Sequence, residues 1–302
     1  MALRRMIAQP NFDSTLAPAQ PGRPAKLTIN LKVTLVPLDP SVPWTPTGTQ
    51  LPPTHLAASK AHMKHGQVKD YNNTAVACRS WLVQEWSEYK VRFKRAVEHA
   101  WNNQMILLPM ESGEAGDGLS DQDYRQFISD PKIQAHAEGA IDITLMPLNV
   151  VGHALIEVAH LENAGARFRV WMHRITDESV QFARHEDKKW PGWFTGQITV
   201  AHEVGHWLRS LNSTHFEHID AEYAKNLPAA RRAKEQYGHT LGRKAALMGD
   251  GSLVTDHEAR PWLTRMRRQT TMKLGWSMMH KIHFSKVANN LSDRQKRLTS
   301  RP

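Results

Sequence analysis

The stretch Val200-Ala201-His202-Glu203-Val204-Gly205-His206 constrains this chain more than any other part of it. Its two histidines are four residues apart, so on an α-helix they lie one turn apart on the same face. Imidazoles placed in this way can bind one Zn²⁺ with bonds of about 2.0–2.1 Å. Glu203 projects beside them, where it can take a proton from a metal-activated water and pass it to a leaving amine. The stretch predicts a helix with His202 and His206 as zinc ligands and Glu203 as general base.

The residues around this stretch repeat with the spacing of a helix. The apolar positions that share this spacing are Ile198, Val200, Ala201, Val204 and Leu208. They predict a helix over residues 196–211, with the hydroxyl of Thr195 as its cap.

A catalytic zinc site needs a third protein ligand, and the sequence leaves this ligand open. Metzincins place it six residues after the second histidine, behind a glycine, but Arg209 and Asn212 occupy those two positions here. One candidate group comprises His215, His218, Asp220 and Glu222, and the other comprises Asp250, Asp256, His257 and Glu258. Met248, just before the second group, resembles the methionine turn beneath zinc in metzincins. We therefore favour His257 as the third ligand, with Glu222 as the alternative.

Other side chains are candidates for stabilising an oxyanion or for binding substrate. A phenol or an imidazolium near the metal can stabilise a tetrahedral intermediate, which makes Tyr237, His239 and Tyr223 candidates. The alternating residues 167–173 predict a strand that an extended substrate could pair with through its main chain.

The remaining periodicities predict an α+β protein. Strands are expected at residues 26–38, 105–109 and 141–148, where apolar residues alternate or form short runs. Helices are expected at residues 76–101, 221–234 and 261–283, where apolar residues recur at three and four. Strands precede the metal helix and helices follow it. We expect a flexible proline-rich tail at 1–25, one catalytic domain at 26–285 and a basic, disordered tail at 286–302.

The composition of the chain excludes several kinds of site. The chain has 302 residues, 17 histidines, a net charge of +10 and one cysteine, Cys78, so an internal disulfide and a four-cysteine zinc site are both excluded. No stretch is long and apolar enough for a membrane span, and the N-terminus lacks the apolar core of a signal peptide. The basic balance favours acidic partners.

Together these motifs resemble those of bacterial toxin metallopeptidases, the zincin domains attached to type VI secretion spike proteins. The resemblance is carried by the 200–206 stretch, Tyr237-Gly238-His239, the 246–251 turn, and Asp256-His257 with Pro261-Trp262. It implies a zincin-like fold and a protein or peptide substrate. It also implies export by a specialised secretion apparatus into a target cell, with a carrier and an immunity protein as partners.

The sequence also allows two alternative functions. The net charge and basic stretches such as Arg231-Arg232 and 265–268 would fit a nucleic-acid-binding protein without catalysis. Those residues are more simply explained as solvated helix faces, so we expect no nucleic-acid partner. A zinc-dependent cell-wall amidase could use the same ligands, whereas a deaminase would need paired cysteines.

Overall fold

A computed structural model describes the central part of the chain, in two compact units. The described residues are 12–42, 63–64, 66–70, 73–109, 136–150, 152–163, 170, 172–186, 192, 194–208, 218–270 and 276–281. The first unit comprises residues 1–12, 31–100 and 143–218, and the second comprises residues 13–30, 101–142 and 219–302. The sequence predicted one catalytic domain at 26–285, whereas the structure gathers each unit from three separate segments.

The largest sheet contains both parallel and antiparallel strands. Its members are β1 (Asp13–Ala17), β2 (Ala25–Pro37), β6 (Met105–Pro109), β7 (Ala137–Met146), β8 (Ala154–Ala159), β9 (Arg174–Thr176) and β12 (Trp276–His280). The strand order is β12-β6-β7-β2-β8-β9, with β1 beside β2. The pairs β2–β8 and β8–β9 are parallel, and β1–β2, β6–β7 and β6–β12 are antiparallel. A mixed sheet combined with helices agrees with the α+β class.

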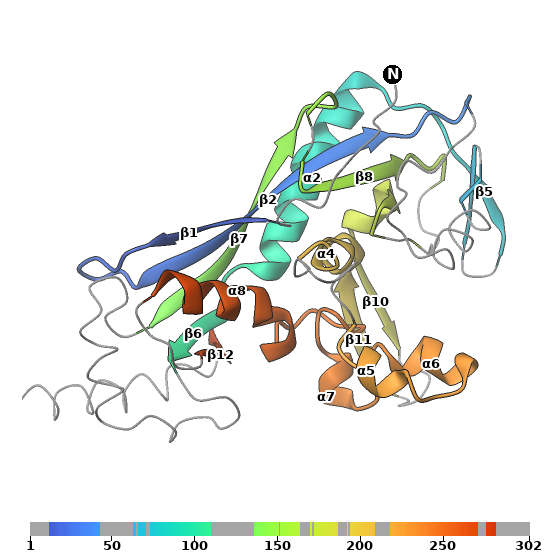
Figure 1. The fold of residues 1–302 in the computed structure, drawn as a ribbon. Helices are drawn as coiled ribbons and strands as arrows, with labels where there is room; N and C mark the ends of the chain where they lie inside the picture. The colour runs from blue at the N-terminus through green and yellow to red at the C-terminus, as the bar shows by residue number, and fades with distance from the viewer. Residues whose placement is uncertain are drawn as a thin grey trace, which may run out of the picture. The chain divides into compact units, whose positions relative to one another are not determined.

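Strand β2, which the alternating sequence at 26–38 predicted, is the longest strand of this sheet (Figure 1). The side chains that share one face and are fully buried are Leu27, Ile29, Leu31 and Val33. β2 pairs with β1 along its first half and with β8 along its second half. Residues 13–17 thus form a sheet strand, although the sequence placed them in the flexible tail; Asp13-Ser14-Thr15-Leu16-Ala17 shows no polar–apolar alternation that could have revealed the strand.

In the first unit, helix α2 (Val83–Trp101) begins later than the sequence predicted. The predicted first turn instead contributes β5 (Ala75–Ala77), which pairs with β4 (Gln67–Lys69), which in turn pairs with β3 (Met63–Lys64). Glu85 sets the helix start, because its carboxylate accepts hydrogen bonds from the backbone of Leu82 at 3.1 Å and from Arg79 at 2.7 and 2.9 Å. Apolar periodicity alone could not reveal this side-chain cap.

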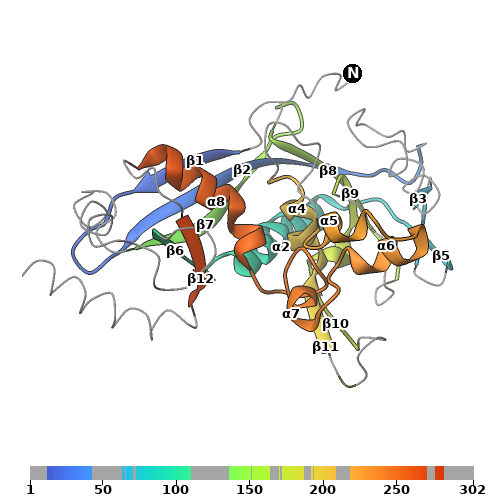
Figure 2. The ribbon, with the colours of Figure 1, turned by 60° about the horizontal axis from the view of Figure 1, so that its bottom comes forward.

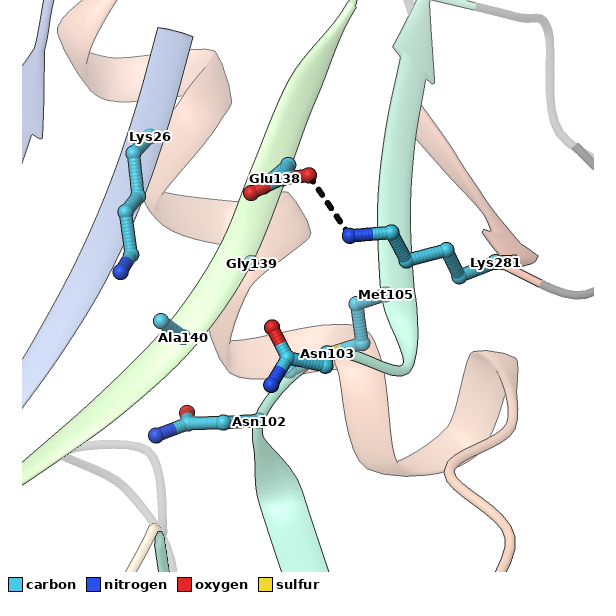
Figure 3. Close-up of a pocket in the computed structure, with 8 residues that line it drawn as sticks. All are labelled: Lys26, Asn102, Asn103, Met105, Glu138, Gly139, Ala140 and Lys281. Atoms are coloured by element: carbon cyan, nitrogen blue, oxygen red, sulfur yellow. Dashed lines mark hydrogen bonds and ion pairs between the residues drawn. The ribbon is translucent and has the colours of Figure 1, made fainter. Parts of the chain in front are cut away.

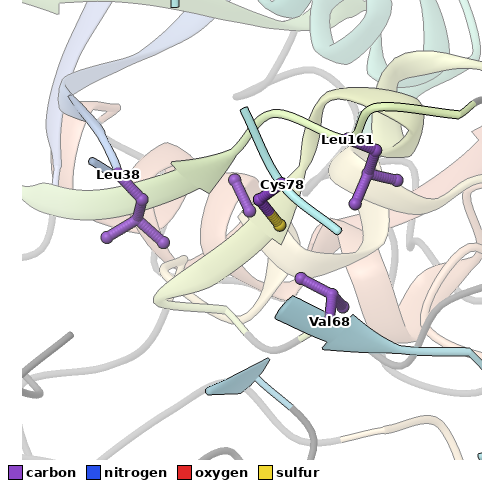
Figure 4. Close-up of a cluster of buried hydrophobic side chains, with 5 residues drawn as sticks. Leu38, Val68, Cys78 and Leu161 are labelled. Atoms are coloured by element: carbon purple, nitrogen blue, oxygen red, sulfur yellow. The ribbon is translucent and has the colours of Figure 1, made fainter. Parts of the chain in front are cut away.

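Cys78 follows β5 and belongs to a small apolar cluster in the first unit. Its buried partners are Leu38, Val68, Ala159 and Leu161 (Figure 4). Burial, with the charges of Asp177 and Glu162, raises the pKa of the Cys78 thiol to about 12. The thiolate is the reactive form, so this cysteine is a packing residue.

We expect Cys78 of the folded protein to react with a thiol-specific disulfide reagent at neutral pH at least about 100-fold more slowly than in denaturant. The high pKa leaves almost no thiolate, and burial blocks access. Absorbance of the released thiol measures the rate. Reaction as fast in the folded as in the unfolded protein would contradict the packing shown here.

The rest of the first unit leads into the predicted metal helix. A 3₁₀ turn, η1 (Asp177–Val180), precedes the hairpin of β10 (Phe182–Glu186) and β11 (Phe194–Ile198), and β11 continues directly into α4 (Thr199–Gly205). Figures 1 and 2 show this hairpin running up to α4. The strand predicted at 167–173 lies largely outside the described residues, and the described Met172 and His173 precede strand β9.

The second unit carries α5 (Ala221–Ala224), α6 (Ala229–Glu235), α7 (Leu241–Lys244) and α8 (Asp256–Gln269). Pro228 separates α5 from α6, which breaks the single helix predicted at 221–234. The helix predicted at 261–283 is wrong in its second half, because β12 pairs there with β6 and contacts α8 (Figure 2). Trp262 of α8 donates a hydrogen bond to the Ala140 carbonyl at 2.8 Å and stacks on Trp101 at 5.5 Å.

The ends of the chain, residues 1–11 and 282–302, lie outside the described residues, so the predicted basic tail at 286–302 stays a prediction. None of the described helices has the length and hydropathy that a membrane crossing requires.

Candidate metal centre

Helix α4 positions the central motif. It begins at Thr199, because β11 keeps pairing with β10 as far as Ile198, opposite Phe182. The sequence predicted the start at residue 196 and Thr195 as the cap; Thr195 instead lies within β11, and no side chain caps the helix. From Val200 onward the side chains of α4 are buried. The motif is therefore held in the interior of the first unit.

Three histidines of the first unit converge at this helix. His202 lies in α4 and His206 at its C-terminal cap, while His218 comes from the chain after it. One ligand nitrogen from each lies within 4.8 Å of the other two. The ring centroids are 5.0 Å apart for His202 and His206, 5.1 Å for His202 and His218, and 4.7 Å for His206 and His218. Among the residues that the structure describes, this is the one group of three or more His, Cys, Asp or Glu side chains close enough to share a metal ion.

The donor set fits a divalent metal such as zinc. Three imidazole nitrogens with a fourth position left for water are a typical catalytic zinc set. Two nitrogens on one tetrahedral zinc lie about 3.4 Å apart, so a small rotation of the rings closes the separation of up to 4.8 Å.

The buried Glu203 carboxyl is a second, independent observation that favours a cation at the histidine group. Its side chain is 8% exposed, and within the described part of the chain it makes no hydrogen bond and no ion pair. Burial raises the pKa of the Glu203 carboxyl to about 8. A buried carboxylate without a partner is costly, and a nearby divalent cation offsets that cost.

The structure brings His218, and neither His257 nor Glu222, close to His202 and His206. His257 lies in the first turn of α8, and Glu222 lies on α5 with its side chain 83% exposed and paired with Lys225. Both belong to the second unit, and neither is a member of the histidine group. Sequence reasoning could not choose between His218 and its neighbours, because residues 207–217 separate it from His206 and the helical spacing of α4 ends at Gly205.

The other candidate ligands have structural roles. Glu258 is fully buried and completes a capping box with Thr255, and it also accepts a hydrogen bond from the Met248 backbone at 2.9 Å. It thereby ties the predicted methionine turn to α8. A side chain at Gly251 in that turn would lie 2.0 Å from the Ala245 carbonyl, so the turn requires glycine. Asp250 pairs with Lys244, and His215 lies outside the described residues.

The candidate oxyanion donors belong to the second unit. The buried Asp220 carboxylate accepts hydrogen bonds from the backbone and the ring of His239, both at 2.7 Å, and from Arg243 at 2.9 Å. The ring of Tyr223 stacks on that of His239 at 4.3 Å. His239 is thus oriented by a carboxylate, while the catalytic roles of His239, Tyr223 and Tyr237 stay predictions.

Gln197 is a site residue that the sequence analysis missed. It is the second-to-last residue of β11, and its carboxamide lies 3.2 Å from Nδ1 of His202. A metal on Nε2 leaves the proton on Nδ1, which can then donate to the carboxamide oxygen after a half-turn of the amide. Such partners fix the orientation of a ligating ring. The spacing from Gln197 to His202 gave no signal, because the contact depends on the strand–helix junction.

We expect Gln197→Ala to weaken zinc binding about 10- to 100-fold, because the His202 ring loses the partner that orients it. Competition with a chromophoric chelator measures the affinity. Gln181→Ala is the matched control, since Gln181 is an exposed glutamine at the start of the same hairpin. Equal zinc affinities of the two variants would show that Gln197 does not orient the His202 ring.

The second unit contains a separate polar hollow of about 120 Å³ (Figure 3). Its lining includes two lysines and two asparagines, and Glu138 on its wall pairs with Lys281 at 3.0 Å. It contains no residue of the histidine group.

Comparison with known proteins identified no relative: no protein-family model, no curated protein and no solved structure matches this chain.

Proposed function

We propose that this chain is a zinc-dependent peptidase with a zincin-like fold, in which His202, His206 and His218 hold the metal and Glu203 is the general base. The observation that carries the proposal is the convergence of three imidazoles on the helix that bears a buried carboxylate without a partner. The order along the chain supports the fold, since six of the seven strands of the mixed sheet precede helix α4 and only β12 follows it.

Zinc, when bound, lowers the pKa of a water molecule to about 7 and polarises the carbonyl under attack. The chain supplies the proton transfers. Glu203 accepts a proton from the attacking water and then donates it to the nitrogen of the leaving amine. A carboxyl group suits both steps, because it accepts the proton as a carboxylate and returns it as the acid.

The protonation state of Glu203 depends on whether a cation is bound nearby. Without a nearby cation the carboxyl is largely protonated near neutral pH, since its pKa lies at about 8. A divalent cation favours the charged form and lowers this pKa. Metal binding would therefore also convert Glu203 to the charged carboxylate, which is the form that acts as a base.

The test is zinc stoichiometry together with hydrolysis of an unfolded protein such as casein. We expect about one zinc per chain, cleavage that stops with a chelator, and recovery when zinc is added back. A folded chain that neither carries nor takes up zinc would refute the proposal. Zinc-dependent release of fragments from muropeptides, with casein left intact, would identify a cell-wall amidase instead.

We further propose that the peptidase acts as a secreted toxin effector, carried by a specialised secretion apparatus and countered by an immunity protein. Only the motif resemblance supports this role. Induced expression in bacteria is the test: we expect the wild type to stop growth and Glu203→Gln to be tolerated at an equal protein level. Normal growth with the wild type in both cytoplasm and periplasm would refute it.

A further inference from the structure

Helix α8 carries a cluster of exposed positive charge. Its sequence contains Arg260, Arg265, Arg267 and Arg268, while Ala259, Trp262 and Met266 form its buried side. Arg260, Arg267 and Arg268 are exposed, and we call them the α8 arginine face. They lie within about two turns of helix. The buried apolar side fixes α8 in the second unit, so the arginine face is held on a rigid element.

The described residues leave the charges of the α8 arginine face without a partner. None of its three guanidinium groups makes an ion pair or a hydrogen bond with any residue that the structure describes. The two acids of α8 are engaged elsewhere: Glu258 is buried in the capping box, and Asp256 accepts a hydrogen bond from the Met278 backbone. An exposed ion pair would have been easy to form at helical spacing, yet none is present on this face.

Repulsion among the arginines of α8 also favours an anionic partner. Arg265, half-buried behind the face, has a pKa lowered by burial and by the neighbouring Arg268, an effect that Asp13 partly opposes. Like charges three or four residues apart destabilise a helix, and a bound polyanion relieves this repulsion. The arrangement favours a partner with closely spaced negative charges.

We infer, contrary to the expectation drawn from the sequence alone, that the α8 arginine face binds the phosphate backbone of nucleic acid. Guanidinium groups bind phosphate oxygens in a bidentate manner, and duplex DNA presents a charge about every 1.7 Å along its axis, so three arginines find phosphates in any register. The face offers no aromatic ring on which bases could stack, because Trp262, the aromatic residue of α8, is fully buried.

A membrane surface fits this face less well than nucleic acid does. Helices that bind membranes insert exposed apolar side chains between lipids. Among the described residues of α8, none is an exposed large apolar residue, and its apolar side packs inside the unit. Binding through charge alone to a soluble polyanion therefore agrees better with the structure.

The experiment measures binding of the full chain to a short labelled DNA duplex of arbitrary sequence as a function of salt, by fluorescence anisotropy. Each arginine–phosphate contact contributes about −1 to the slope of log affinity against log salt concentration. We expect the variant Arg260→Gln with Arg267→Gln and Arg268→Gln to reduce the steepness of that slope by about 3. Circular dichroism checks that the variant folds.

A matched control separates a local site from overall charge. The variant Arg231→Gln with Arg232→Gln and Lys234→Gln removes the same charge from exposed positions of α6, and its slope should stay close to that of the wild type. Equal losses in the two variants would overturn the proposal, because binding would then follow net charge. Equal affinity for polyglutamate or for anionic vesicles would also overturn it.

This inference does not depend on the proposed peptidase activity, because no arginine of the face belongs to the histidine group. Duplex binding should therefore persist in the presence of a chelator and in the Glu203→Gln variant. Loss of binding on metal removal would refute an independent arginine site.

Discussion

Replacing His218 by alanine is expected to abolish stoichiometric zinc binding and to lower zinc affinity by about 1,000-fold or more, because two imidazoles do not complete a tetrahedral site. His218 contributes the third nitrogen of the group whose ligand atoms lie within 4.8 Å of one another. Elemental analysis gives the stoichiometry, and chelator competition gives the affinity. Peptidase activity should disappear together with the metal.

The controls for this prediction are the ligands that the sequence favoured. His257→Ala and Glu222→Ala should keep one zinc per chain, since neither residue belongs to the histidine group. If His257→Ala loses zinc and His218→Ala keeps it, the third ligand is His257, and the convergence at His218 is only a packing contact between rings.

Replacing Glu203 by glutamine is expected to lower the turnover number about 100- to 10,000-fold while leaving zinc bound. The carboxamide has nearly the shape of the carboxylate but cannot carry the proton from the attacking water to the leaving amine. Steady-state kinetics and elemental analysis on the same preparation provide both readouts. Activity close to the wild type, with zinc retained, would assign the proton transfer to another residue.

The same substitution should change how stability depends on pH in the metal-free protein. Burial raises the pKa of Glu203 from 4.5 to about 8, so the folded state holds this proton more tightly than the unfolded state. The free energy of unfolding is then highest below about pH 4.5 and falls as the pH rises to about 8, in total by on the order of 3–5 kcal/mol. Denaturation at pH values below and above this range measures the change.

Glu203→Gln should remove this part of the pH dependence, because glutamine does not titrate. Bound zinc should also remove it in the wild type, since a nearby cation favours the charged carboxylate. An unchanged pH dependence in the variant would show that Glu203 is better solvated than its 8% exposure indicates.

Several elements could be predicted from the sequence because each is encoded by a local pattern. The alternation over residues 26–38 predicted β2, which spans Ala25–Pro37, and the apolar run from Met105 to Pro109 predicted β6. The spacing of His202 and His206 placed two imidazoles on one face of a helix, and both now lie in the histidine group. In each case the information lies within about a dozen neighbouring residues.

Errors arose where the partner is distant in the sequence. The segment Trp276–His280 carries apolar residues that fit a helix, but pairing with β6, more than a hundred residues earlier, makes it a strand. Strand β8 is buried on both faces and shows no alternation, so periodicity did not detect it. The periodicity of a short segment does not show which distant segments will pack against it in the folded protein.

The sequence by itself determined that His202 and His206 share one helix face with the Glu203 carboxylate between them, because both features follow from the period of an α-helix. Only the tertiary structure decided that His218 lies beside the pair, that Gln197 contacts the His202 ring, and that the α8 arginine face makes no ion pair with any residue that the structure describes. Each of these depends on how distant segments pack, and chain spacing does not specify the distance between side chains that folding brings together.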